Sequence, residues 1–189
     1  MPCVVITGGP GAGKTTLLTE LGRRGFATVA ESARALIAER LAAGQGPRPD
    51  PWDFAVEIRR RDIENYERHR GDAGWTFFDR GVLEAVAMVH KARPLPAAEL
   101  QALVRRSPFH PQVVVLPPWP EIYVTDAERD QGYDDAVRVH AAIVDWYAGL
   151  GYRIITLPPG PVAWRADQVL GALGDGAGEP GIMRRDRGT

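Results

Sequence analysis

The sequence is short of several features that mark whole classes of protein. It has a single cysteine, Cys3, so the chain can form neither an internal disulfide nor a cysteine metal cluster. Its purely apolar runs, such as Val113 to Leu116, are far shorter than the roughly 20 residues that a transmembrane helix needs. A formal net charge of −1 argues against a protein that binds nucleic acid through bulk positive charge. We therefore expect no membrane partner and no nucleic-acid partner.

The amino-terminal end carries no targeting signal. The first expected strand begins at residue 3, which leaves no room for a charged leader and an apolar segment, so we expect a cytoplasmic location. The length of 189 residues fits one folded domain, which we place at residues 1–173. The tail, residues 174–189, offers almost nothing to bury and is expected to be flexible.

Short runs of β-branched or aromatic residues alternate with longer amphipathic segments. This order is typical of an α/β fold, with a parallel sheet and helices on both faces. Strands are predicted at Cys3 to Thr7, Ala27 to Ala30, Trp75 to Asp79, Gln112 to Leu116 and Arg153 to Leu157. Helices are predicted at about 14–23, 32–43, 52–69, 81–92, 97–106, 134–150 and 162–173. In the sixth helix, the spacing predicts an apolar face of Val137, Ala141, Val144 and Tyr147.

A phosphate-binding motif lies between the first strand and the first helix. Gly8, Gly13, Lys14 and Thr15 match G-x-x-x-x-G-K-[ST] in the strand-to-helix context that the mechanism requires, which disfavours a glycine-rich turn with a chance lysine. The glycines let backbone N–H groups point inward as an anion nest. Lys14 is expected to reach the β and γ phosphates, and the Thr15 hydroxyl to bind Mg²⁺. The predicted nucleotide-binding residues are Gly8, Gly9, Pro10, Gly11, Ala12, Gly13, Lys14, Thr15 and Thr16.

The third strand ends in "TFFDRG", at the edge where open α/β sheets bind their ligands. Asp79 follows a hydrophobic run, as a Mg²⁺-associated acid should. Arg80 stands where many P-loop ATPases have a glutamate that polarises water, and a cation there is better suited to steadying a substrate or phosphate. The alternative for Asp79 is a helix N-terminal carboxylate without a metal.

The second strand ends in "AESAR", which places Glu31 at the same edge and Arg34 one helical turn later. A carboxylate beside a phosphate-transfer site can accept a proton from an attacking hydroxyl. The arginine can bind the substrate or pair with that carboxylate. The alternative is that Glu31 is only a first-turn helix acid.

Four segments, "GGPGAGKTT", "AESAR", "FFDRG" and "LPPWPEIYVTDAERD", together resemble a family of small bacterial P-loop proteins often labelled AAA-domain ATPases. Related to them are the kinase domain of NadR-type nicotinamide riboside kinases and, more remotely, thymidylate and deoxynucleoside kinases. The resemblance covers about residues 1–173. It implies a P-loop three-layer α/β/α sandwich, a five-stranded parallel sheet with the phosphate-loop strand at its centre, and a helical lid. By motif position it assigns the contact with the acceptor hydroxyl to Glu31, and the acid–arginine pair to Asp79 and Arg80.

Further candidates lie outside these motifs. The segment after the fourth strand looks like the lid of the related kinases, and Arg129 is its predicted arginine. Trp119 is predicted to stack on a base or substrate ring. In the kinases that the chain resembles, the region of helix 52–69 lines the acceptor pocket, which implies Arg61 and Tyr66 as substrate contacts. The alternatives are a solvent-exposed arginine for Arg129, ordinary packing for Trp119 and a solvated charged face for the helix.

The combined prediction is an ATP- and Mg²⁺-dependent kinase acting on a small nucleoside-like or other hydroxyl- or phosphate-bearing metabolite. The predicted catalytic residues are Lys14, Glu31, Asp79, Arg80 and Arg129; the substrate contacts are Glu31, Arg34, Arg61, Tyr66, Arg80 and Trp119; the metal contacts are Thr15 and Asp79. Two alternatives remain open: an enzyme that only hydrolyses ATP, and a nucleotide-dependent binding module or switch. An AAA+ motor fits poorly, because about 15 residues after the last helix cannot form its usual helical lid domain. The sequence leaves the acceptor and the oligomeric state open.

Overall fold

The computed structural model describes residues 3–47, 49–123 and 132–174. The strands are β1 (Cys3–Gly8), β2 (Ala27–Val29), β3 (Thr76–Asp79), β4 (Gln112–Leu116) and β5 (Arg153–Thr156). The helices are α1 (Lys14–Arg23), α2 (Ser32–Ala42), α3 (Pro51–His69), α4 (Val82–Ala92), α5 (Ala97–Arg106), α6 (Tyr133–Gly149) and α7 (Val162–Leu173), and the 3-10 turn η1 (Pro120–Ile122) follows β4. The predicted strands and helices are confirmed, each boundary within about one residue, as expected when hydrophobic periodicity and turn residues agree.

The strands form one parallel sheet in the order β2-β3-β1-β4-β5. In β1, Cys3 is in register with Thr76 of β3, and Ile6 is in register with Val114 of β4. The phosphate-loop strand is therefore central, as the resemblance implied. Because all strands run the same way, the ends of β1, β2 and β3 meet at one edge of the sheet.

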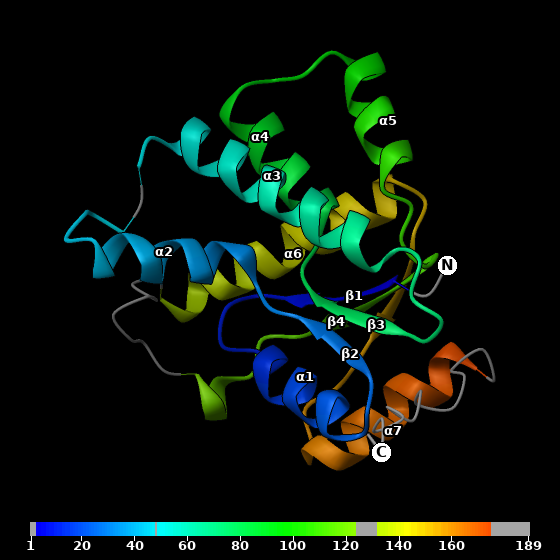
Figure 1. Ribbon diagram of the computed structural model, residues 1–189. Helices are drawn as coiled ribbons and strands as arrows, with labels where there is room; N and C mark the ends of the chain where they lie inside the picture. Colours follow the sequence, from blue (N-terminus) through cyan, green and yellow to red (C-terminus); the bar gives the residue numbers. More distant parts are fainter. Residues whose placement is uncertain (1–2, 48, 124–131, 175–189) are drawn as a thin grey trace, which may run out of the picture.

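Helices cover both faces of the sheet. Figure 1 shows α1 and α7 on one face and α3, α4 and α6 on the other. Successive strand residues point to opposite faces, so Val4 and Ile6 pack in the core beneath α1 and α7, whereas Cys3 and Val5 pack in the second core. The result is the predicted three-layer α/β/α sandwich.

The apolar face of α6 differs from the prediction. Val137 is 42% exposed and Ala141 is also exposed, so these two of the four predicted residues do not face the core. The buried residues of α6 are Ala136, Ile143 and Tyr147. The prediction was wrong because several near-equivalent apolar stripes exist on an alanine- and valine-rich helix, and the docking of Tyr147 against the sheet selects one of them.

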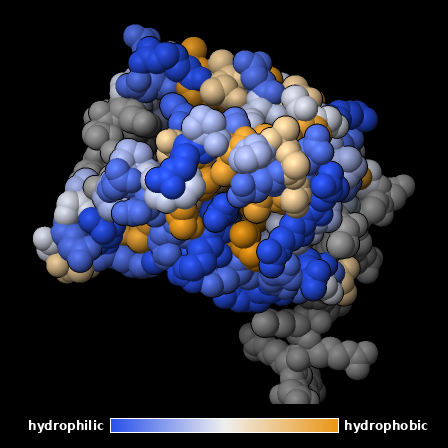
Figure 2. All heavy atoms as spheres, turned by 90° about the horizontal axis from the view of Figure 1, so that it is seen from above, coloured by the Kyte–Doolittle hydropathy of each residue, from blue (hydrophilic) through white to orange (hydrophobic). Residues whose placement is uncertain are grey.

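The outer surface is mixed in character. Figure 2 shows hydrophobic side chains as separate patches among hydrophilic ones on the face seen from above. No helix in the described part of the chain combines the length and hydrophobicity that crossing a bilayer requires.

Candidate functional site

The phosphate loop joins β1 to α1 at the carboxyl edge of the sheet. Gly8 has φ of 140°, and a Cβ there would lie 2.3 Å from the carbonyl oxygen of Leu116, so no other residue fits. Gly13 has φ of 79° and caps α1 in the left-handed conformation. These conformations let the loop curl around the amino-terminal end of α1, an arrangement that binds anions.

Lys14 is the first residue of α1, and its side chain is buried. Its Nζ donates hydrogen bonds to the carbonyl oxygens of Gly8, at 3.3 Å, and Gly9, at 3.1 Å. Burial, followed by the charge of Arg80, lowers the pKa of Lys14. The ammonium group thus lies inside the loop, where a phosphate oxygen would be a stronger partner than two neutral carbonyls.

Arg80 ties the phosphate loop to two carboxylates. Its backbone has a φ of 65°, and this conformation strains a non-glycine residue by roughly 1–3 kcal/mol. Nη2 donates to the Gly8 carbonyl at 3.1 Å, Nε to Glu31 Oε1 at 3.1 Å and Nη1 to Glu84 Oε2 at 2.6 Å. Burial acts to lower the pKa of Arg80, but Glu31, Glu84 and Asp79 outweigh it and raise the pKa. Arg80 therefore stays a cation that fixes Glu31 beside the loop.

The carboxyl groups of Glu31 and Asp79 have opposite pKa shifts. Burial acts to raise the pKa of Glu31, but the charges of Arg80, Lys14 and Arg34 outweigh it and hold the pKa below its usual value. Burial is the main reason that the pKa of Asp79 rises to about 6, with Lys14 opposing it and Glu31 adding to it. Carboxyl groups that differ in this way are suited to different tasks. Glu31 is a fixed anion, whereas Asp79 would gain from a further cation.

Asp79 and Thr15 fit a metal ion that arrives with a phosphate ligand. Oδ1 of Asp79 is buried and has no hydrogen-bond partner among the described residues, and such an atom is costly unless water or a cation reaches it. Thr15 is exposed on the wall of the same cavity. The described residues contain no group of three or more His, Cys, Asp or Glu side chains placed to hold a metal. A divalent ion here would therefore need oxygen ligands from a bound phosphate.

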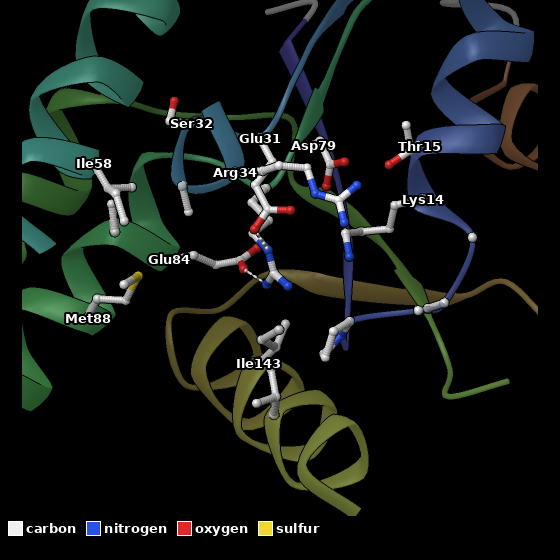
Figure 3. Close-up of a pocket in the computed structure, with 18 of the residues that line it drawn as sticks. Lys14, Thr15, Glu31, Ser32, Arg34, Ile58, Asp79, Glu84, Met88 and Ile143 are labelled. Carbon is white, nitrogen blue, oxygen red and sulfur yellow. Dashed lines mark hydrogen bonds and ion pairs between the residues drawn. The ribbon is translucent and has the colours of Figure 1, made fainter. Parts of the chain in front are cut away.

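These residues open onto a cavity of about 890 Å³, which is near the upper end of the range of about 300–1,000 Å³ for small-molecule sites. We call one side the loop half, which is lined by residues 10–16 and Asp79. The other side is the helical half, which is lined by α2, α3, α4 and α6. Figure 3 shows charged side chains in the middle of the cavity and Ile58, Met88 and Ile143 on the side away from Thr15.

Most of the predicted site residues line this cavity. They are Pro10, Gly11, Ala12, Gly13, Lys14, Thr15, Thr16, Glu31, Arg34, Asp79, Arg80 and Trp119. Gly8 and Gly9 belong to the loop and accept the hydrogen bonds of Lys14. Arg129 lies outside the described residues.

The structure does not bring Arg61 and Tyr66 to the cavity. Arg61 pairs with Glu39 and Glu57, away from the cavity. Tyr66 is buried in the core, where its hydroxyl donates to the Pro108 carbonyl at 2.9 Å. On α3 the cavity is lined by Phe54, Ile58 and Asp62, at four-residue spacing. Arg61 is rotated away from this stripe, and Tyr66 continues it one turn too far, beneath the core.

Three charged residues of the cavity wall were not predicted: Asp62, Glu84 and Arg165. Glu84 follows Arg80 at the four-residue spacing of a helical ion pair, which was a readable signal. Asp62 was hidden in a strongly charged helix in which most side chains form surface ion pairs.

Arg165 lies on α7, next to the phosphate loop. It is buried, which lowers its pKa, and its Nη2 donates to the Ala12 carbonyl at 3.4 Å. Its Cζ lies 5.4 Å from the centroid of the Trp119 ring. Its Nε is buried and has no hydrogen-bond partner among the described residues. Arg165 and Trp119 together form a flat, partly cationic wall beside the loop.

Solved structures of three kinases share this fold. Thymidylate kinase from Candida albicans has a TM-score of 0.61 and 14% identity, over 91% of this chain and 90% of that chain. Deoxyadenosine kinase from M. mycoides with bound dATP has a TM-score of 0.61 and 12% identity, over 90% and 98%. Shikimate kinase from Acinetobacter baumannii in complex with shikimate has a TM-score of 0.54 and 18% identity, over 92% and 93%.

Sequence comparison identifies the family. Among proteins of curated function none is significantly similar to this chain. Residues 3–165 match a protein family described as an AAA domain, and this range includes the phosphate loop, Glu31, Asp79 and Arg165. The chain therefore belongs to this AAA-domain family, with the α/β P-loop fold that it shares with thymidylate, deoxyadenosine and shikimate kinases.

Proposed function

We propose that the protein is a small-molecule kinase, which transfers the γ-phosphoryl group of ATP, bound with Mg²⁺, to a hydroxyl or phosphate oxygen of a metabolite. One observation carries this proposal: the phosphate loop and Glu31 face the same cavity, and that cavity continues past Lys14 into the helical half. A hydrolase needs space only for water beside the γ-phosphate, whereas a kinase needs a second compartment. The names of the kinases with the same fold support the same reaction class.

The loop half is the proposed site of the triphosphate. The loop amides and Lys14 bind the β and γ phosphates, and Lys14 exchanges the carbonyls of Gly8 and Gly9 for phosphate oxygens. Thr15 and Asp79 hold Mg²⁺, which when bound neutralises charge on the phosphate oxygens. Trp119 and Arg165 offer the base a flat wall with an unused N–H donor.

Glu31 is the proposed proton acceptor when the attacking group is a hydroxyl. The acceptor oxygen bonds to the γ-phosphorus, the bond from that phosphorus to the bridging oxygen breaks, and ADP leaves with the electron pair. The acceptor proton passes to the Glu31 carboxylate, which stays ionised because its pKa is low and which Arg80 holds in place. A weakly basic carboxylate is adequate, because a loose transition state needs orientation more than strong activation of the nucleophile.

Cations around the γ-phosphate favour transfer over hydrolysis in this proposal. Lys14 and Arg80 neutralise the developing charge. Arg80 follows Asp79 directly, and its guanidinium is bonded to Glu31, Glu84 and Gly8, so it does not orient water as a glutamate would. Arg129 remains the predicted lid arginine that would exclude water on closure.

The test is product analysis with γ-labelled ATP and a panel of metabolites that carry hydroxyl or phosphate groups. The label should appear on at least one acceptor, and Glu31→Gln should lower that transfer by about 10²–10⁴-fold while the affinity for an ATP analogue is kept. Glu39→Gln, on the exposed side of the same helix, is the matched control. If the label appears only as inorganic phosphate with every acceptor, the kinase proposal is overturned. If capture of a protein partner then depends on nucleotide, the switch alternative takes its place.

A further inference from the structure

The helical half of the cavity has walls that are mostly apolar. Ile37 comes from α2, Phe54 and Ile58 from α3, Met88 from α4 and Ile143 from α6. Ile37, Phe54 and Ile58 also form a small hydrophobic cluster of their own, separate from the two cores beside the sheet. A surface of this kind binds the carbon skeleton of a ligand and gives little to a heavily hydroxylated or phosphorylated one.

Asp62 is the acidic residue that α3 places in this apolar wall. The Ser32 hydroxyl donates a hydrogen bond to its carboxyl group, and Asn65 Nδ2 donates in turn to Ser32 Oγ at 3.4 Å. Ser32 is buried. This chain of donors holds the carboxylate in one orientation without neutralising it.

Asp62 has no cationic partner of its own in the described part of the chain. Arg80 is the nearby cation that acts on its pKa, but the guanidinium of Arg80 is hydrogen-bonded to Glu31, Glu84 and Gly8. Burial is the largest cause that raises the pKa of Asp62, to about 7, and Glu84 and Glu31 raise it further. Two other cations line the cavity: Lys91 is exposed at the end of α4, and Arg34 acts on the pKa of Glu31. Neither is among the charges that shift the pKa of Asp62.

The position of Asp62 therefore selects for positive charge in a ligand. An ammonium group in the helical half would gain the ion pair that Asp62 lacks, in a site where burial strengthens it. A carboxylate or phosphate placed there would face Asp62, Glu31 and Glu84 together. Because Glu31 acts on the pKa of Asp62, the two carboxylates are close enough for one small molecule to meet both.

We propose that the phosphoryl acceptor is an amino alcohol with an apolar body, whose hydroxyl meets Glu31 and whose protonated amine pairs with Asp62. This inference rests on the proposed kinase function, because it names the acceptor of that reaction. It assigns to Asp62 a role in acceptor specificity that neither its sequence context nor the family match indicates.

The test uses matched sets of alcohols. Each set has one apolar skeleton and three members: an amino alcohol, its uncharged analogue with methyl in place of the amine, and its analogue with a carboxylate. One such set is 3-(aminomethyl)benzyl alcohol, 3-methylbenzyl alcohol and 3-(hydroxymethyl)benzoate, and further sets vary the spacing from two to eight bonds. ATP-dependent phosphorylation is followed by mass spectrometry. Binding to the protein loaded with a non-hydrolysable ATP analogue is followed by calorimetry.

We expect the amino alcohols to be bound and phosphorylated at least tenfold better than both analogues in at least one set. Asp62→Asn, which is nearly isosteric, should remove this preference and leave the weak reaction of the uncharged alcohols within about twofold. Glu67→Gln, on the exposed face of the same helix, is the control and should keep the preference. A thermal unfolding measurement shows that both variants are folded.

The inference is overturned if the uncharged or carboxylate members are preferred in every set, or if Asp62→Asn weakens all members equally. In either case phosphorylation of another acceptor would leave the kinase proposal standing. Conversely, if no acceptor receives phosphate but amino alcohols bind in an Asp62-dependent manner, the kinase proposal fails and the charge preference of the helical half stands.

Discussion

The two halves of the cavity are built in different ways. The loop half comes mainly from one continuous segment, residues 10–16, in which glycine conformations and the start of α1 define the site. The helical half is assembled from α2, α3, α4 and α6, and its residues are distant from one another in the sequence. The difference separates a general task from a particular one. A triphosphate can be held by local backbone geometry, whereas an acceptor is selected by side chains that only the packing of helices brings together.

The largest effect should come from removing Lys14. Lys14→Ala deletes the one ammonium group inside the loop, so we expect transfer to fall by about 10²–10³-fold, as when a single preorganised donor is lost. Calorimetry should show weaker binding of an ATP analogue and unchanged binding of the acceptor. Arg23→Ala, at an exposed position of the same helix, is the control. Equal loss of acceptor binding would mean that the two halves are not independent.

Replacing Arg80 should damage both halves, because its guanidinium bridges them. Arg80→Met leaves Glu31 and Glu84 without their hydrogen-bonded cation, and breaking buried pairs in this way costs about 3–5 kcal/mol. Urea unfolding at pH 7 measures the loss. The double variant Arg80→Met/Glu84→Gln, which also removes one of the two uncompensated charges, should recover part of it. A variant as stable as the wild type would show that the network contributes little to folding.

Asp62→Asn should stabilise the protein at alkaline pH but not at acid pH. The pKa of Asp62 is raised from 3.8 to about 7, so ionisation disfavours the folded state. This penalty is absent below pH 3.8, grows as the pH rises towards 7 and is complete above it. At about 1.36 kcal/mol per pKa unit, the variant gains up to about 4 kcal/mol at pH 8. Thermal unfolding at pH 4 and pH 8 measures the difference, and an equal change at both values would contradict the assignment.

Trimming the apolar wall should have the smallest effect. Met88→Ala shortens a side chain that is 36% exposed at the edge of the helical half, so little stability should be lost. We expect KM for the acceptor to rise about three- to tenfold, in line with roughly 1 kcal/mol of lost apolar contact, while KM for ATP and kcat stay within about twofold. Steady-state kinetics with each substrate varied in turn would show the split. A rise in KM for ATP instead would place Met88 on the nucleotide side.

Residues of the site differed in how well they could be predicted. The glycines, Lys14 and Thr15 follow from a local pattern. Glu31 and Asp79 follow from a general rule, because residues that close parallel strands meet at one edge of the sheet. Arg61 and Tyr66 were expected at the cavity but lie away from it, because a charged helix does not reveal which of its faces turns inward. Asp62, one residue from Arg61, lines the wall instead.

The sequence by itself determined the order and nearly the boundaries of the strands and helices, the phosphate loop and the edge of the sheet at which the site lies. These depend on periodicity, turn residues and strand direction, which are local properties of the chain. Only the tertiary structure decided which faces of α3 and α6 are buried, how Arg80 divides its hydrogen bonds, and that Asp62 lies without a cation in an apolar wall. Such features depend on how helices rotate and dock against one another, and a rotation of one residue, about 100°, exchanges a surface side chain for one that meets the ligand.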